Sequence, residues 1–344
     1  MSQKNETLPL FLAIIVTIGL IFGGIWFLLE RWAALTKVTA NPTSSIQELS
    51  TNTCNPELKV PTGTFNYGGS TTWAPLRKEA DPELQRICPQ FFLRYTQPPV
   101  GIPGSGTGIQ MLIDNQLAFA QSSRSIKGEE NTAARQKGFS LQEIPVAIDG
   151  IAVAVNPSLN IRGLTIAQIK DIYISKITNW REVGGPNLTI TPYSRRPETS
   201  GTVEFFVENV LQKGKLGTTV KYIDTTTEAI RVIATNSGAI YYASAPEIVP
   251  QCTIKPLPIG RDSGQLVPPY QEPLVSLDEC VRGKRSQLNA QAFRSGEYPI
   301  TRNLFIILKQ NGQTDQQAGY AYANWLLTPQ GQGLVEKAGF VRIK

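Results

Sequence analysis

The stretch Tyr193–Phe206, reading YSRRPETSGTVEFF, joins a predicted strand to a predicted helix. Leu188 and Ile190 alternate with polar residues before it, whereas Val203 and later apolar residues recur at helical spacing. The first N–H groups of a helix have no partner within the helix and point beyond its end, and an arginine beside them adds charge-assisted hydrogen bonds. This stretch is therefore compatible with an anion site. Taken alone, however, SGT at a helix start is more often ordinary N-capping.

Two other turns share this glycine-and-hydroxyl composition. They are Gly69–Thr71 and Gly104–Thr107, and each stands, like Thr199–Thr202, between a predicted strand and a predicted helix. Small residues at a single turn of this kind are usually structural. Three such turns, together with Arg124 and Arg196, indicate that hydroxyl, N–H and guanidinium donors converge on one anion.

The strand–turn–helix pattern recurs from Thr62 onward and predicts an α/β fold with a largely parallel sheet. In such sheets, ligands bind beyond the carboxyl ends of the strands. Ile144–Asn156 (IPVAIDGIAVAVN) is too long for one ordinary strand, so we expect it to cross from one lobe to another. Ala239–Ala243 is the expected return crossing, and Asp149 is expected to cap a turn at the first crossing.

The composition excludes several kinds of chemistry. The 344 residues carry a net charge of +6 and contain no histidine. Without histidine there is no Ser-His or Cys-His catalysis and no His-ligated zinc. No block of lysine and arginine with interleaved aromatic residues is present, so nucleic acid is not an expected partner.

Common enzyme motifs are missing as well. The sequence has no GxxxxGK[ST] phosphate loop, no GxGxxG dinucleotide loop and no GxSxG nucleophile turn. The acidic pairs Glu129-Glu130 and Asp278-Glu279 lie in polar stretches and are expected on the surface. We therefore predict a binding protein with no catalytic residue, metal or cofactor.

The N-terminal region predicts attachment to a membrane. Leu8–Leu29 contains no charged residue and would span about 33 Å as a helix, which is enough for the hydrocarbon core. The apolar region of a cleavable signal is usually shorter. We expect an uncleaved single-pass anchor within residues 1–38, followed by a polar tether over residues 39–61.

The cysteines suggest an oxidising compartment. Cys54, Cys88, Cys252 and Cys280 form no CxxC pair, and four cysteines allow three connectivities. We predict the sequence-local pairing, Cys54–Cys88 and Cys252–Cys280, in a domain outside the cytoplasm.

Thr62–Lys344 resembles the phosphate-binding receptor family of bacterial ABC importers, which has the type II periplasmic binding protein fold. The motifs that carry the resemblance, in order, are YGGSTTWAPL, GIPGSGTGIQMLID, QSSRSI, EIPVAIDGIAVAVN, LTIAQIKDIY, ITNW, RPETSGTVEFF, SGAIYYA and YPITRNLFIIL.

The resemblance implies two α/β lobes joined by two crossing strands, with residues 62–145 and 243–344 in the first lobe and residues 146–242 in the second. It also implies a monomer on the periplasmic face of the inner (plasma) membrane, which binds inorganic phosphate and passes it to an inner-membrane ABC permease. The implied anion contacts are Ser70, Thr71, Ser105, Ser123, Arg124, Arg196, Ser200, Gly201 and Thr202.

In this assignment Arg196 is the guanidinium partner of the anion, Glu198 orients it, and Arg124 is a second cation. One position departs from well-known members, because Ser123 stands where they carry an aspartate. That carboxylate accepts the proton of hydrogen phosphate and rejects fully ionised anions. The choice between phosphate and an oxyanion such as sulfate or molybdate therefore stays open, as does a role as an anchored anion sensor without transport.

Overall fold

The computed structural model describes residues 54, 58–197 and 200–343. The predicted anchor at residues 8–29 and most of the tether lie outside this part of the chain. Among the helices of the described residues, none combines the length and the apolar composition that a membrane span needs.

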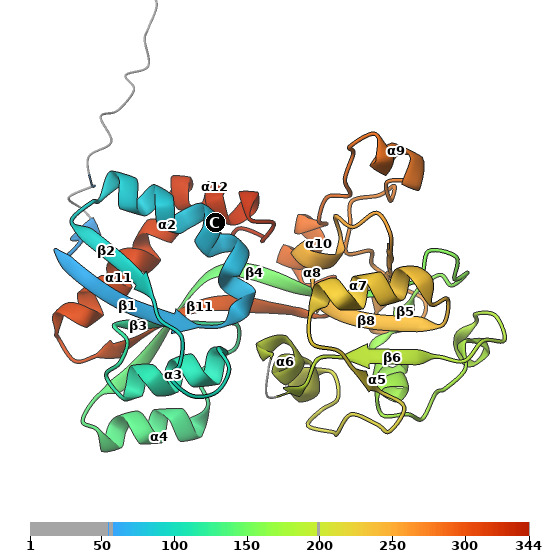
Figure 1. Ribbon diagram of the computed structural model, residues 1–344, viewed down its shortest axis with the longest axis horizontal. Helices are drawn as coiled ribbons and strands as arrows, with labels where there is room; N and C mark the ends of the chain where they lie inside the picture. Colours follow the sequence, from blue (N-terminus) through green and yellow to red (C-terminus); the bar gives the residue numbers. More distant parts are fainter. Residues whose placement is uncertain (1–53, 55–57, 198–199, 344) are drawn as a thin grey trace, which may run out of the picture. The chain divides into compact units, whose positions relative to one another are not determined.

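The first lobe is an α/β layer structure around a mixed sheet (Figure 1). Its strands, in spatial order, are β2 (Phe91–Tyr95), β1 (Gly63–Gly69), β3 (Phe119–Ser122), β11 (Thr301–Gln310) and the first part of β4 (Ser140–Val155). β1 runs parallel to both β2 and β3, and β11 is antiparallel to β3 and β4. The predicted α/β class is confirmed for this lobe.

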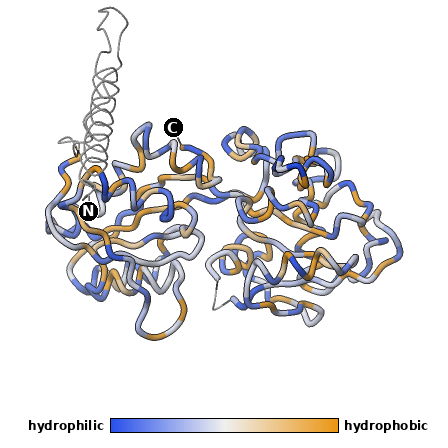
Figure 2. The backbone as a smooth tube through the Cα atoms, turned by 45° about the horizontal axis from the view of Figure 1, so that its top comes forward, coloured by the Kyte–Doolittle hydropathy of each residue, from blue (hydrophilic) through white to orange (hydrophobic). Residues whose placement is uncertain are grey.

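Helices cover both faces of the first sheet. A 3-10 turn, η2 (Thr71–Trp73), leads into α2 (Ala74–Ile87), which packs on one face with α11 (Thr314–Leu326) and α12 (Pro329–Lys337). The opposite face carries α3 (Ser105–Ile113) and α4 (Gly128–Gln136), which have their own apolar core. Figure 2 shows hydrophobic stretches running through the interior of each lobe.

β4 connects the two lobes. It pairs with β11 over Ser140–Gly150 and with β8 (Ala239–Ser244) over Ile151–Val155, so one strand contributes to both sheets. The β4–β11 ladder shifts register at Pro145, where Val146 is the extra residue. Proline cannot donate to a ladder and is tolerated at such bulges. The predicted crossing at Ile144–Asn156 agrees with this strand.

The second lobe continues the sheet beyond β4. β8 pairs with β6 (Thr191–Ser194), which pairs with β7 (Lys221–Tyr222), while β9 (Lys255–Pro256) adds to β4 and β10 (Ile259–Gly260) pairs with β5 (Leu164–Thr165). Its helices are α5 (Ile166–Tyr173), α6 (Gly201–Asn209), α7 (Thr226–Thr235), α8 (Ala245–Ile248), α9 (Leu277–Val281) and α10 (Ala290–Ser295), with a further 3-10 turn η3 (Trp180–Val183). A single large core spans this lobe.

The return to the first lobe lies later in the chain than expected. Ala239–Ala243, predicted as the second crossing, belongs to β8 inside the second sheet, and β11 is the strand that returns. Residues between β8 and β11, such as Ile248 and Phe293, pack in the core of the second lobe. The second lobe therefore extends beyond residue 243, where the sequence predicted its end. A buried apolar strand has the same local sequence whether it crosses or stays, because only its pairing partners differ.

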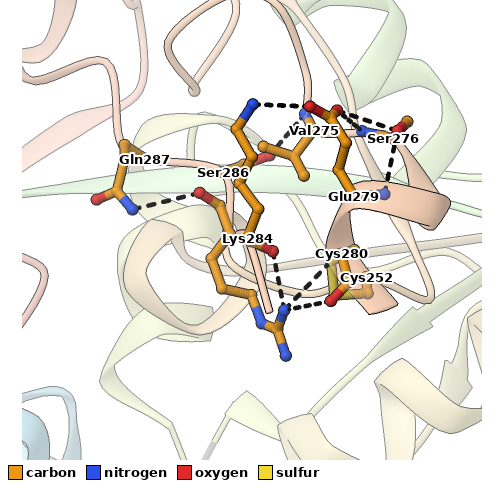
Figure 3. Close-up of a disulfide and its surroundings, with 9 residues drawn as sticks. Cys252, Val275, Ser276, Glu279, Cys280, Lys284, Ser286 and Gln287 are labelled. Carbon is orange, nitrogen blue, oxygen red and sulfur yellow. Dashed lines mark hydrogen bonds and ion pairs between the residues drawn. A yellow bond between two sulfur atoms is a disulfide. The ribbon is translucent and has the colours of Figure 1, made fainter. Parts of the chain in front are cut away.

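Both predicted disulfides are present. Cys54 bonds to Cys88 at the end of α2 in the first lobe, and Cys252 bonds to Cys280 in α9. Figure 3 shows the second bond beside Glu279, which accepts from Ser276 at the helix start and pairs with Lys284 at 2.8 Å. The capping box and the disulfide together fix this short helix in a loop-rich segment.

Candidate functional site

Three buried serines meet at the carboxyl ends of neighbouring strands. Ser70 follows β1, Ser123 follows β3, and Ser105 opens α3. The Ser123 Oγ lies 3.0 Å from the Ser70 Oγ and 3.3 Å from the Ser105 Oγ, and the Ser123 N–H donates to the Ser105 Oγ at 3.0 Å. These hydroxyls can rotate between donating and accepting, so together they offer a ligand several hydrogen bonds.

Glycines make this close meeting possible. A Cβ at Gly108 would lie 2.4 Å from the Cα of Gly69, so α3 could not approach the end of β1 with any other residue there. Gly69 itself has φ +121°, a conformation that L side chains rarely adopt. The glycine-and-hydroxyl turns are therefore needed for packing as well as for any ligand.

The second lobe contributes the N-terminus of α6. Gly201 lies so close to the serines that a Cβ there would be 3.2 Å from the Ser123 Oγ, 3.3 Å from the Ser105 Oγ and 3.8 Å from the Ser70 Oγ. Ser200 is the N-cap residue and is buried. The unpaired first-turn N–H groups and the positive end of the helix dipole thus face the hydroxyls of the first lobe.

Arg302 is a central residue that the sequence analysis missed. It lies on β11, its side chain is 2% exposed, and its guanidinium is 2.8 Å from the carboxylate of Asp149. Nη2 donates to the Thr72 hydroxyl of the first lobe at 3.1 Å and to the Thr202 hydroxyl of the second at 2.9 Å. A charge inside an otherwise apolar strand was the available signal, because such a charge requires a partner.

Asp149 has a different role from the one expected. It lies within β4 and does not cap a turn, and besides Arg302 it accepts a hydrogen bond from the Ser244 hydroxyl at 2.6 Å. Burial raises the pKa of Asp149, while the charge of Arg302 acts in the opposite direction. The aspartate is therefore a fixed counter-ion between the two lobes.

Arg124 is close to the serines but is already engaged with carboxylates. Its guanidinium donates to both oxygens of Glu130, at 2.7 and 3.0 Å, and to Glu204 of α6 at 3.2 Å. A Cβ at Gly106 would lie 3.2 Å from its Nη2, so the group sits against the start of α3. The predicted second cation thus shares its charge with two acidic side chains.

Arg196, the predicted guanidinium partner, lies beside β7 of the second lobe. Its side chain is exposed, and its guanidinium lies 5.0 Å from the ring centroid of Tyr222. Glu198, predicted to orient it, is outside the described residues. The structure sets the guanidinium of Arg302 beside Thr202.

A cavity of about 500 Å³ lies beside the α6 terminus and is lined by residues of both lobes. Three of the predicted contacts, Thr71, Ser200 and Thr202, line it, together with Tyr241 and Glu247. Burial and the neighbouring Asp149 charge raise the pKa of Glu247. The wall of this cavity is therefore rich in hydroxyls and carries one buried carboxyl group. A second cavity of about 980 Å³ is lined by both lobes, including Arg124 and Glu204.

Known proteins share this architecture. A family profile described as the PBP superfamily domain matches residues 59–330. The phosphate-binding protein PstS of Staphylococcus epidermidis is 29% identical over 81% of this chain and 78% of its own length, and the SphX protein of Synechococcus elongatus is 34% identical over 42% of this chain and 43% of its own length.

Solved structures agree in fold. A putative phosphate ABC transporter substrate-binding protein with bound phosphate from Clostridium perfringens aligns with a TM-score of 0.63 and 24% identity, covering 82% of this chain and all of the other. An ABC-type phosphate transport receptor from Vibrio cholerae aligns with a TM-score of 0.62 and 20% identity, over 80% of this chain and 99% of that one. The resemblance drawn from the motifs is thus confirmed, and the chain belongs to the PBP superfamily.

Proposed function

We propose that this protein is a receptor that captures inorganic phosphate between its lobes and delivers it to an ABC importer. The main support for this proposal is that the Ser70, Ser105 and Ser123 hydroxyls converge beneath the N-terminus of α6. Hydroxyls and helix-end N–H groups are the donors that a tetrahedral oxyanion requires. Similar proteins in the superfamily are named for phosphate binding, which supports this choice of ligand.

The mechanism is capture by closure of the two lobes. The serines belong to the first lobe and α6 to the second, so the full set of donors exists only when the lobes meet. An anion that bonds to both sides favours the closed arrangement by its differential affinity. The connection that must bend is the β4–β11 pair.

Most of the proposed ligand contacts are those expected from the sequence. Ser70, Ser105 and Ser123 supply hydroxyls, α6 supplies N–H groups through its first turn, and Arg196 is the proposed charged partner. We add Arg302 as a positioning residue, because it holds Thr202 and Thr72 toward the same place. Arg124, expected as a second cation, is not among the proposed contacts, because its guanidinium pairs with Glu130 and Glu204.

Another tetrahedral oxyanion is the second candidate ligand. Ser123 brings a hydroxyl to the centre of the site, and a hydroxyl can donate to a fully ionised anion as readily as it accepts from a protonated one. Sulfate or molybdate would then bind as well as phosphate. An anion sensor without a transport role is distinguished by testing whether the protein co-purifies with a permease.

Calorimetric titration of the full chain, purified in detergent and stripped of anion, tests the proposal. We expect tight binding of phosphate and a loss of about ten- to a hundredfold in affinity in Arg196→Ala and Ser123→Ala, since each removes donors to a charged ligand. Ser125→Ala, at an exposed serine two residues further along, is the matched control. Binding of sulfate alone would reassign the ligand, and binding of neither anion would refute the proposed function.

The cellular placement is also a proposal. We infer that the protein is a monomer, held by one uncleaved helix within residues 8–29 on the periplasmic face of the inner membrane. The disulfides are in keeping with an oxidising compartment. Isolation of a soluble mature form that begins near residue 35 would contradict the anchor.

A further inference from the structure

Four charged side chains form a cluster that bridges the lobes. Arg124, Lys127 and Glu130 belong to the first lobe, and Glu204 belongs to α6 of the second. The Glu204 Oε1 lies 2.5 Å from the Lys127 Nζ and 3.2 Å from the Arg124 Nε, while Arg124 also holds Glu130 at 2.7 Å. We call this set the interlobe ion cluster.

The cluster is electrically balanced and partly shielded from water. Two cations face two carboxylates. The Arg124 side chain is buried and that of Glu130 is 12% exposed, whereas those of Lys127 and Glu204 are about one-third exposed. Burial alone would raise the pKa of Glu204, but the hydrogen bond from Lys127 and the charge of Arg124 outweigh it, so the pKa lies below its usual value. Glu204 is therefore ionised and paired at neutral pH.

Glu204 lies in the first turn of the helix that completes the site. Gly201, at the start of the same turn, faces the serine hydroxyls, and Thr202 is held by Arg302. The α6 terminus is thus fixed at two points, by a central contact on β11 and by the interlobe ion cluster. Of these two contacts, the interlobe ion cluster is the one that connects α6 to the start of α4.

We propose that Glu204 is a positioning residue that latches α6 onto the first lobe and so sets how long the captured anion stays bound. The proposal rests on the proposed function of anion capture. Glu204 does not contact the anion, since its carboxylate is directed to Arg124 and Lys127. Loss of the latch should increase the rate of opening and leave the encounter with the anion nearly unchanged.

A purely electrostatic role makes the opposite prediction. A carboxylate near an anion site repels the ligand, so its neutralisation would strengthen binding and raise the association rate. The latch predicts weaker binding through faster dissociation. The sign of the change therefore separates the two accounts.

The test measures phosphate association and dissociation rates by stopped flow on the full chain in detergent. We expect Glu204→Gln to raise the dissociation rate by about tenfold and to change the association rate by less than about threefold. Glu208→Gln, one turn further along α6, is the matched control and should stay within about twofold of the parent. Tighter binding in Glu204→Gln, or equal effects of the two variants, would overturn the latch.

A double-mutant cycle that combines Glu204→Gln with Lys127→Met tests the latch in a second way. If both residues belong to one latch, the double variant should release phosphate no faster than Glu204→Gln alone. Fully additive effects would overturn the pairing of Lys127 with Glu204 as the origin of the slow release.

A measurement without ligand tests the latch independently of phosphate binding. Hydrogen exchange is followed in segments 124–130 and 201–209, and we expect faster exchange in both segments in Glu204→Gln but not in Glu208→Gln. If the parent protein fails to bind phosphate, the proposed function is refuted while this comparison still decides the latch. Unchanged exchange in both segments would overturn it.

Discussion

The Asp149–Arg302 pair places two opposite charges where both side chains are almost fully buried, at 0% and 2% exposure. Removing such charges from water is expensive, and their attraction compensates only if the geometry and the additional hydrogen bonds are good. Here Ser244, Thr72 and Thr202 supply those hydrogen bonds. The pair is thus a fixed element of the interior that also touches the candidate site.

Asp149→Asn should destabilise the protein by about 3–5 kcal/mol, because it leaves the Arg302 charge buried without a counter-ion. Urea unfolding of the parent and the variant measures this difference. Asp171→Asn is the control, since Asp171 pairs with Lys176 at the surface and should cost about 1 kcal/mol or less. A similarly small loss of unfolding free energy in both variants would show that the buried pair stabilises the fold no more than the surface pair does.

Tyr241 should make stability sensitive to alkaline pH. Burial raises its pKa from 10.0 to about 12. A raised folded pKa gives stability that is complete below the unfolded value and is lost as pH rises through the folded one. The stability of the parent relative to Tyr241→Phe should therefore be constant below pH 10.0 and fall toward pH 12.

Denaturant unfolding of the two proteins across this pH range measures the difference. Other buried tyrosines titrate equally in both, so their contribution cancels. A constant difference between the two proteins up to pH 12 would contradict the raised pKa.

At the scale of elements, the disulfide at α9 closes a loop between Cys252 and Cys280, which are 28 residues apart. The enclosed segment contains little regular structure, so its order depends on the cross-link and on a few caps. Cross-linking restricts the unfolded chain more than the folded one.

Replacing Cys252 and Cys280 together by serine should lower the free energy of unfolding by about 3–4 kcal/mol, from the loop-closure entropy of this separation. Urea unfolding under non-reducing conditions measures the loss, with the Cys54–Cys88 bond intact in both proteins. Addition of a reductant to the variant then reports the contribution of the Cys54–Cys88 bond separately. A loss below about 1 kcal/mol would mean that the segment is held by its other contacts.

The elements differ in how far the sequence could predict them. Thr165 caps α5, with its hydroxyl accepting from the Gln168 N–H. Such a cap can be predicted from sequence because capping is a local interaction. The pairing of the crossing strands joins residues that are far apart in the sequence. Ala239–Ala243 in β8 was predicted as the return strand because its pairing partner could not be read from the sequence. The role of Arg302 was not predicted for the same reason, because its partner Asp149 lies 153 residues earlier in the sequence.

The part of the chain that the structure describes forms two lobes linked by β4 and β11, with candidate ligand groups on both sides. The turns that carry Ser70 and Ser105 were predictable, since parallel strands bring their ends together. Their distances and the position of α6 above them were not, because they depend on the packing of both lobes. The ion pairs between lobes likewise follow from tertiary structure alone.

Phosphate should stabilise the folded chain by mass action. At a concentration of 100 times its dissociation constant, we expect a gain of about 2.7 kcal/mol in the free energy of unfolding. Thermal unfolding of the full chain with phosphate, sulfate or chloride at equal ionic strength measures the gain. Equal shifts with all three salts would indicate a general salt effect, in contradiction to a specific site.

The Cys54–Cys88 bond has a mechanical consequence. A pull transmitted along the chain toward Cys54 passes through the sulfur atoms directly to Cys88 at the end of α2. Residues enclosed by the bond, which include β1 and the turn that carries Ser70, are outside this path of force. A load on the N-terminal side of the domain would therefore reach the first lobe without straining the turn at which the candidate site begins.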